Sequence, residues 1–132
     1  MRKTKLTELE ALRLLVQYVL PVEFTRYFDI VNIIDVGGTL QIYLDESDIP
    51  PEEYRDIDLS SNGFYAPSTI KDFPLRDRKV VLQVRRRRWV DSLGKSYSRD
   101  WELVAQGTRY SKEFAAFLKE AFGFTPGSDS VS

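Results

Sequence analysis

The sequence predicts an α+β domain in which helices near the two ends of the chain flank two antiparallel β-hairpins. Apolar residues recur at helical spacing near both ends. Between them, two stretches rich in branched residues are each divided by a turn that contains glycine. With 132 residues, 42% of them hydrophobic and 30% charged, the chain has the length and composition of one globular domain.

The N-terminal part is expected to form two helices. Over residues 6–20, Thr7 and Glu10 have the spacing of a capping box, and Pro21 prevents the helix from continuing. A short second helix is expected over residues 22–28. We interpret the apolar faces of both as core rather than as ligand grooves; they consist of Leu9, Leu12, Leu15, Val16, Val19 and Leu20 in the first helix and of Phe24, Tyr27 and Phe28 in the second.

Two hairpins are expected from alternating patterns around glycine. The first joins residues 30–36 to residues 40–44 through Gly37-Gly38, a pair that supplies positive φ and lacks the pattern of a phosphate-binding loop. The second is longer and joins the arms 80–90 and 96–104, with Gly94 at a left-handed position of its loop.

Proline and glycine positions and the spacing of apolar residues predict the remaining segments. Residues 45–58 are an acidic connection with one helical turn beginning at Pro50-Pro51, and residues 60–79 are expected to be irregular or short-stranded. Ser111 is expected to cap a C-terminal helix. Residues 1–124 then make a single domain, and residues 125–132 a disordered tail.

The chain contains no histidine and no cysteine. This excludes disulfides, cysteine nucleophiles, Ser-His catalysis and every zinc site built from imidazole or thiolate. No segment has the pattern of a signal peptide or of a membrane span, so we expect a cytoplasmic protein without a membrane partner. We also expect no cofactor.

The net charge of −1 conceals two opposite blocks. Residues 29–58 hold nine acids against one base, a balance of −8. Residues 76–112 hold eleven bases against four acids, a balance of +7. A β-hairpin this basic, with two tryptophans among the arginines, meets the physical requirements of a nucleic-acid-binding ribbon. The candidate DNA-binding residues are Arg76, Arg78, Lys79, Arg85, Arg86, Arg87, Arg88, Trp89, Lys95, Arg99, Trp101, Arg109 and Lys112.

Other interpretations remain open at this point. The acidic and basic blocks could neutralise each other within one chain or across a homodimer, and the chain would then be a protein-interaction module without direct DNA binding. A metal-dependent nuclease would need three converging acids, for which Asp29, Asp35 and Asp45 are the candidates. Aspartates at strand ends are more often turn or cap residues, so we expect no enzymatic activity from this chain alone.

The basic region also resembles a known family. The stretch FPLRDRKVVLQVRRRRWVD, followed by GKSYSRDWELVAQGTR and SKEFAAFLKE, is similar to the N-terminal region of bacterial insertion-sequence transposases. The segments LLVQYVLPVEFTRYFDIV, IYLDE and GFY are similar to a branch in which a short upstream frame encodes this region alone, without the DDE-type catalytic domain. The resemblance covers roughly residues 10–122.

The resemblance implies a role in transposition and DNA recombination by a mobile element. It implies double-stranded DNA at the transposon ends and a separate DDE-type catalytic subunit as partners, with Arg85 to Arg88, Lys95, Arg99 and Arg109 as DNA contacts. In relatives the hairpin resembles a zinc ribbon, but residues 90–95 stand here where a Cys-x-x-Cys knuckle would follow Trp89. No metal is therefore expected.

Overall fold

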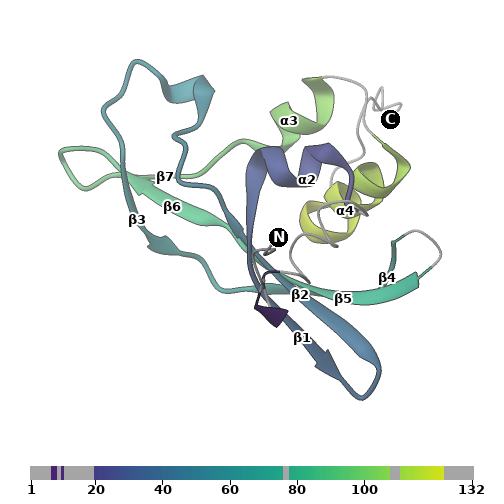
Figure 1. Cartoon of the computed structure of the whole chain (residues 1–132). Helices are drawn as coiled ribbons and strands as arrows, with labels where there is room; N and C mark the ends of the chain where they lie inside the picture. Colours follow the sequence, from purple (N-terminus) through teal and green to yellow (C-terminus); the bar gives the residue numbers. More distant parts are fainter. Residues whose placement is uncertain (1–6, 9, 11–19, 76–77, 108–110, 124–132) are drawn as a thin grey trace, which may run out of the picture.

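The computed structural model describes residues 7, 8, 10, 20–75, 78–107 and 111–123, and its topology confirms the α+β class. Two sheets and three helices account for most of these residues (Figure 1). The elements in chain order are α2 (Val22–Tyr27), β1 (Phe28–Val36), β2 (Thr39–Glu46), the 3₁₀ turn η1 (Glu52–Tyr54), β3 (Ser60–Phe64), β4 (Ser68–Leu75), β5 (Arg78–Arg85), β6 (Arg87–Val90), β7 (Ser96–Tyr97), α3 (Trp101–Gly107) and α4 (Lys112–Phe122).

The strands form two sheets of different kind. Sheet A is mixed, with strand order β1-β2-β5-β4, and its central pair β2 and β5 is parallel. Sheet B is antiparallel, with strand order β3-β6-β7. A parallel central pair needs a long crossover, and here the acidic connection, β3 and β4 supply it.

One stretch of chain serves both sheets. Strand β5 ends at Arg85 in sheet A, and β6 begins at Arg87 in sheet B. Between them, the carbonyl of Arg86 accepts a hydrogen bond from the backbone N–H of Tyr65 at 2.8 Å. The run of four arginines therefore lies where the chain passes from one sheet to the other.

The hydrophobic core lies between sheet A and the helices, which gather on one side of it (Figure 1). Val80, Leu82 and Val84 alternate along β5 and are buried, as the period of a strand predicts. The ring of Phe24 from α2 packs edge-on against Phe117 of α4 at 4.8 Å between centroids. The apolar faces of the second predicted helix and of the C-terminal helix are thus core, as predicted.

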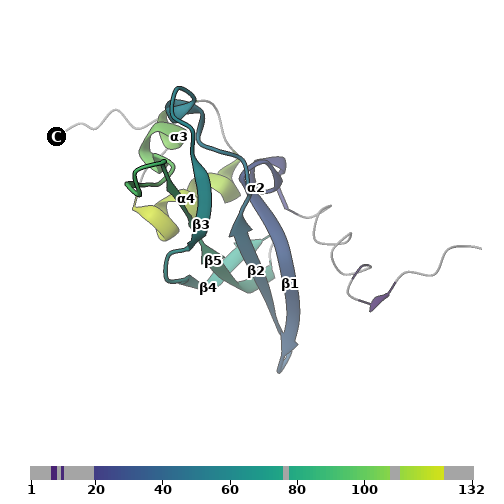
Figure 2. The same ribbon diagram turned by 90° about the vertical axis from the view of Figure 1, so that its left-hand side faces the viewer.

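The first hairpin is confirmed and is longer than expected. Strands β1 and β2 pair in antiparallel register over their full length, and their turn lies at the end far from the helices (Figure 2). Gly37 and Gly38 have φ of 59° and 86°. Positive φ at both central residues is the geometry of a type I′ turn, whose twist matches that of the two strands. The carboxylate of Asp35 accepts a hydrogen bond from the Gly38 N–H at 3.0 Å.

The second hairpin is shorter than predicted. Residues 80–85 pair with β2 and β4 instead of with residues 96–104, and only Trp89 and Val90 pair with Tyr97 and Ser96. Both hydrogen-bonding edges of β5 are occupied, so no second arm can be added to it. Gly94 has φ of 85°, which confirms the left-handed position predicted for the loop.

The predicted second arm ends early because a helix begins within it. Residues 101–107 form α3, and the Asp100 carboxylate accepts a hydrogen bond from the Leu103 N–H at 3.1 Å. An aspartate before the first helical turn is a strong helix start, and here it outweighs the β pattern of the sequence. Residues 60–79, expected to be irregular or short-stranded, hold β3, β4 and the start of β5.

Both ends of the domain carry the caps that the sequence predicts. The Thr7 N–H donates to Glu10 at 2.9 Å and the Glu10 N–H to Thr7 at 3.1 Å, the reciprocal bonds of a capping box. Most of the predicted helix 6–20 and the predicted tail 125–132 lie outside the described residues. The Ser111 side chain accepts from the Phe114 N–H at 3.2 Å and so caps α4. Among the described helices, none is long and apolar enough to cross a membrane.

Candidate nucleic-acid interface

The four consecutive arginines differ in their bonding partners, and the partners alternate along the chain. Arg85 makes a two-pronged pair with Asp45 of β2, with its Nε donating to Oδ1 at 2.7 Å. The backbone N–H of Arg87 donates to Glu46 Oε1 at 3.1 Å, and its Nε donates to the Glu46 carbonyl at 3.0 Å. The odd-numbered arginines are thus bound to the acidic end of β2. The even-numbered ones are not.

Glu46 is the centre of this acidic end and is fully buried. Its Oε2 accepts from Arg99 Nε at 3.1 Å, while the Arg99 NH2 donates to the Ile49 carbonyl at 2.7 Å. Burial raises the pKa of Glu46, and the hydrogen bond from the Arg87 backbone and the Arg99 charge offset part of that rise. The indole N–H of Trp89 also lowers this pKa, although it makes no hydrogen bond of good geometry.

A phenylalanine of β3 packs against the same arginines. The guanidinium carbons of Arg85 and Arg87 lie 4.1 Å and 4.6 Å from the centre of the Phe64 ring. Arg87 NH1 also donates to Ser61 Oγ at 2.6 Å. Arg85 and Arg87 therefore hold sheet B against the end of β2, which is a structural task.

Arg86 and Arg88 have no carboxylate partner among the residues that the structure describes. Arg86 lies over the rings of Tyr65 and Phe122, at 5.2 Å and 5.8 Å, and lines an open hollow of about 300 Å³ together with Arg99 and Asp100. Arg88 Nε donates only to the carbonyl of Asn62, at 3.2 Å. Both side chains are half-buried.

The other predicted bases are scattered over the surface. Lys79, Lys95 and Lys112 are exposed, and the Lys95 ammonium lies 5.2 Å from the centre of the Tyr97 ring. Nothing is described of the Arg78 side chain, and Arg76 and Arg109 lie outside the described residues.

Both tryptophans are core residues. Trp89 and Trp101 are 1% and 2% exposed. Trp101 stacks on Phe28 and Phe122, with centroids 5.2 Å and 4.7 Å away. In this fold neither indole presents a face to a nucleic acid, because the protein itself covers almost all of the surface that stacking on a base would need.

The turn between β6 and β7 keeps its shape through one aspartate. Asp91 Oδ1 accepts from the N–H groups of Leu93 and Lys95, each at 2.9 Å, and its Oδ2 accepts from the Tyr97 hydroxyl at 3.1 Å. The hydrogen bond from the Lys95 N–H is the largest of the effects that lower the pKa of Asp91. These bonds hold the backbone of residues 91–97 in a closed turn.

The three aspartates considered as metal ligands have other partners. Asp29 accepts from the Ser47 hydroxyl at 3.2 Å, Asp35 caps the first hairpin turn, and Asp45 pairs with Arg85. Within the described part of the chain, no cluster of three or more acids could hold a metal ion.

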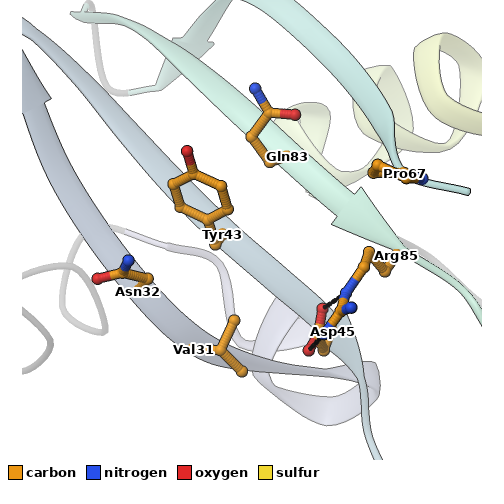
Figure 3. A pocket seen from close by; sticks show the side chains of 7 residues that line it. All are labelled: Val31, Asn32, Tyr43, Asp45, Pro67, Gln83 and Arg85. Atoms are coloured by element: carbon orange, nitrogen blue, oxygen red, sulfur yellow. Dashed lines mark hydrogen bonds and ion pairs between the residues drawn. The ribbon is translucent and has the colours of Figure 1, made fainter. Parts of the chain in front are cut away.

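A hollow on the face of sheet A that is turned away from the described helices is not indicated by any motif of the sequence. It has a volume of about 360 Å³ and is lined by Asn32 of β1, Tyr43 of β2, and Gln83 and Arg85 of β5 (Figure 3). Alternation could have indicated it, since Tyr43 lies between the buried residues Ile42 and Leu44 and must therefore face away from the core. The sequence predicted β1 as one neighbour of β2 but did not indicate that β5 is the other.

The whole chain was compared with known proteins. No family model, no curated protein and no solved structure matches it. Its family and function are therefore proposed below from its own residues.

Proposed function

We propose that this chain is the DNA-binding N-terminal segment of a split insertion-sequence transposase. It recognises the terminal duplex of the element and serves a DDE-type catalytic subunit encoded separately. The observation that carries this proposal is that Arg86 and Arg88 form no ion pair with a described acid, whereas the adjacent Arg85 and Arg87 are bound to Asp45 and Glu46.

Electrostatics explain why this pair favours a polyanion. Like charges that are neighbours along a strand repel one another, and of the four arginines only Arg85 forms an ion pair with a described acid. The guanidinium of Arg87 donates to the Glu46 carbonyl and to the Ser61 hydroxyl, whereas Arg86 has no such partner and Arg88 donates to one carbonyl. A planar guanidinium binds the oxygens of a phosphate through two parallel hydrogen bonds. Phosphates of a DNA backbone would therefore supply to Arg86 and Arg88 what the protein does not.

Two further features support the proposal. The resemblance to transposase N-terminal regions rests on the segments that hold the arginine run, β7, α3 and α4. The exposed Lys79, Lys95 and Lys112 add positive charge that can contact phosphates without fixing a sequence.

The test is the salt dependence of binding to the terminal duplex of the element. We expect Arg86→Ala with Arg88→Ala to reduce the slope of log affinity against log salt by about 2, roughly 0.9 per lost phosphate contact. The matched control removes two exposed lysines that are not among the candidates, Lys71→Ala with Lys119→Ala, and should leave the slope nearly unchanged. Fluorescence anisotropy between about 50 and 200 mM salt measures both. The absence of duplex binding at low salt, or equal slopes for the two double variants, would contradict the proposal.

A second candidate is a protein-interaction module, favoured by an apolar surface. Ile49 and Leu103 are 59% and 50% exposed and line a hollow of about 410 Å³, with Glu52 and Glu53 beside them. The fitting occupant is an apolar side chain of the catalytic subunit, flanked by bases. If Leu103→Asp abolishes a salt-sensitive complex in light scattering while the chain shifts no DNA, this candidate replaces the first.

A further inference from the structure

The turn between β6 and β7 presents a leucine to solvent. Leu93 is 91% exposed, the largest exposed fraction of any large hydrophobic side chain in the part of the chain that the structure describes. The turn lies at the end of sheet B that points away from the helices (Figure 1). The core therefore does not use this side chain, and its apolar surface is available to a partner.

The conformation of the turn does not require a leucine. The Gly94 N–H donates to the Asp91 carbonyl at 3.1 Å, and the Asp91 N–H donates to the Lys95 carbonyl at 3.0 Å. A turn closed in this way by a glycine with positive φ accepts polar residues at its two central positions, here Ser92 and Leu93. Polar residues are the usual choice at an exposed turn. An apolar side chain at this position thus indicates a role outside the folding of the chain.

The leucine is held on a rigid support. The Leu93 N–H donates to Asp91 Oδ1 at 2.9 Å, and Asp91 Oδ2 accepts from the Tyr97 hydroxyl at 3.1 Å. The Tyr97 ring packs edge-on against Tyr54 of η1, with 5.0 Å between centroids. A partner that takes up the leucine side chain does not have to order this turn first, which lowers the entropic cost of binding.

Positive charge lies close to the leucine along the chain. Lys95 is exposed in the same turn, and Arg88, five residues before Leu93, donates only to the carbonyl of Asn62. An extended chain spans about 3.4 Å per residue, so Leu93 lies within about 17 Å of Arg88. That distance corresponds to about five base pairs of DNA. One duplex can therefore contact both residues, while the acid of the turn, Asp91, is engaged by the donors of the turn itself.

We propose that Leu93 is a wedge that inserts between two adjacent base pairs of the bound duplex and kinks it. Several classes of DNA-binding protein kink a duplex by inserting an apolar side chain, and leucine is one of the residues that serve this purpose. Lys95 and Arg88 then contact phosphates near the kink. The inference rests on the proposed function, since the duplex is the one that Arg86 and Arg88 bind. It adds a task that a charged side chain does not perform.

The first test places 2-aminopurine at single adenine positions of the terminal duplex, because this base fluoresces more strongly when it loses its stacking. With the full chain we expect an increase at one base step, and energy transfer between dyes on the two duplex ends should report a kink of about 20–90°. Leu93→Ser should abolish both signals, whereas Leu93→Met keeps an apolar wedge and should retain them. The matched control, Val36→Ser, removes a 51% exposed apolar side chain beside the turn of the first hairpin and should change neither signal.

The second test is the salt dependence, which separates the wedge from the phosphate contacts. Leu93→Ser should weaken duplex binding about tenfold, near the lower end of what burial of a leucine side chain contributes. It should leave the slope of log affinity against log salt unchanged, because the leucine releases no counterion.

The outcomes distinguish this inference from the proposed function. Duplex binding without a fluorescence increase at any step, or with the same increase for Leu93→Ser as for Val36→Ser, would overturn the wedge and leave the proposed function standing. The absence of duplex binding at low salt would overturn both. If light scattering without DNA shows that Leu93→Ser dissociates an assembly of copies of the chain, the leucine belongs to a protein interface and the wedge is overturned.

Discussion

Glu46 and Arg99, which are 53 positions apart in the sequence, form an ion pair inside the protein. Their N···O distance is 3.1 Å, and their side chains are only 0% and 9% exposed. The pair joins the end of β2 to the segment before α3, and Arg87 adds a backbone hydrogen bond to the same carboxylate. The contact between the acidic and basic blocks is therefore part of the folded core of one chain.

Removal of the Glu46 carboxylate should be strongly destabilising. Glu46→Ala leaves Arg99 buried without its counter-charge, and we expect a loss of about 3–5 kcal/mol in the free energy of unfolding. Glu52→Ala is the control, because its pair with Arg55 spans 3.7 Å between side chains that are 87% and 76% exposed. The control should change the free energy by less than about 0.5 kcal/mol. Urea unfolding measures both, and similar losses for the two variants would contradict the buried pair.

The raised pKa of Glu46 predicts a pH dependence of stability with a definite sign. The folded state holds this proton more tightly than the unfolded chain, whose pKa is near 4.5. Relative to Glu46→Gln, the wild type should therefore lose stability as the pH rises from 4.5 through the raised pKa. Urea unfolding over this range tests the sign, and a relative loss toward acid would contradict it.

The two tryptophans should not report DNA binding directly. Trp89 and Trp101 are 1% and 2% exposed, so acrylamide should quench their fluorescence weakly in the folded protein. Addition of duplex DNA should leave that quenching unchanged, because neither indole becomes covered by DNA. Protein unfolded in urea gives the reference for full access. A marked decrease in quenching when DNA is added would place an indole at the interface.

The turn between β6 and β7 should depend on Asp91. We expect Asp91→Ala to speed hydrogen exchange at the amides of Leu93 and Lys95, which both donate to this carboxylate. Because the pKa of Asp91 is lowered from 3.8, the protection in the wild type should persist at pH 3.8 and be lost only further toward acid. Asp48→Ala, at an exposed acid, should leave both amides unchanged. Unchanged exchange in Asp91→Ala would show that the carboxylate does not hold the turn.

Short sequence motifs predicted the turns, the helix starts and the buried strand face, because these features depend on residues close together in the sequence. Gly37-Gly38 predicted a tight hairpin turn, Ser111 predicted the start of α4, and Pro50-Pro51 predicted one helical turn, found as η1. The alternation Val80, Leu82, Val84 predicted the buried face of β5. Each of these signals acts within a few residues, where backbone preference and side-chain period suffice.

The candidate site was predicted only in part, because its outcome depends on distant partners. The sequence indicated that Arg85 and Arg87 share one face and Arg86 and Arg88 another. It did not indicate which of these arginines would pair with an acid, since that follows from the parallel register that sets Asp45 beside Arg85. It also placed Trp101 in a strand, where the Asp100 cap begins a helix instead.

The sequence by itself determined an α+β chain with apolar helix faces, one hairpin with a Gly-Gly turn, and one acidic and one basic segment. The tertiary structure alone decided that Asp45 pairs with Arg85 and Glu46 with Arg99, and that both tryptophans are core. The physical reason is the distance along the sequence over which each interaction acts. Turns, caps and periodicity are set by neighbouring residues, whereas ion pairs and burial depend on which strand edges and faces meet after the whole chain has packed.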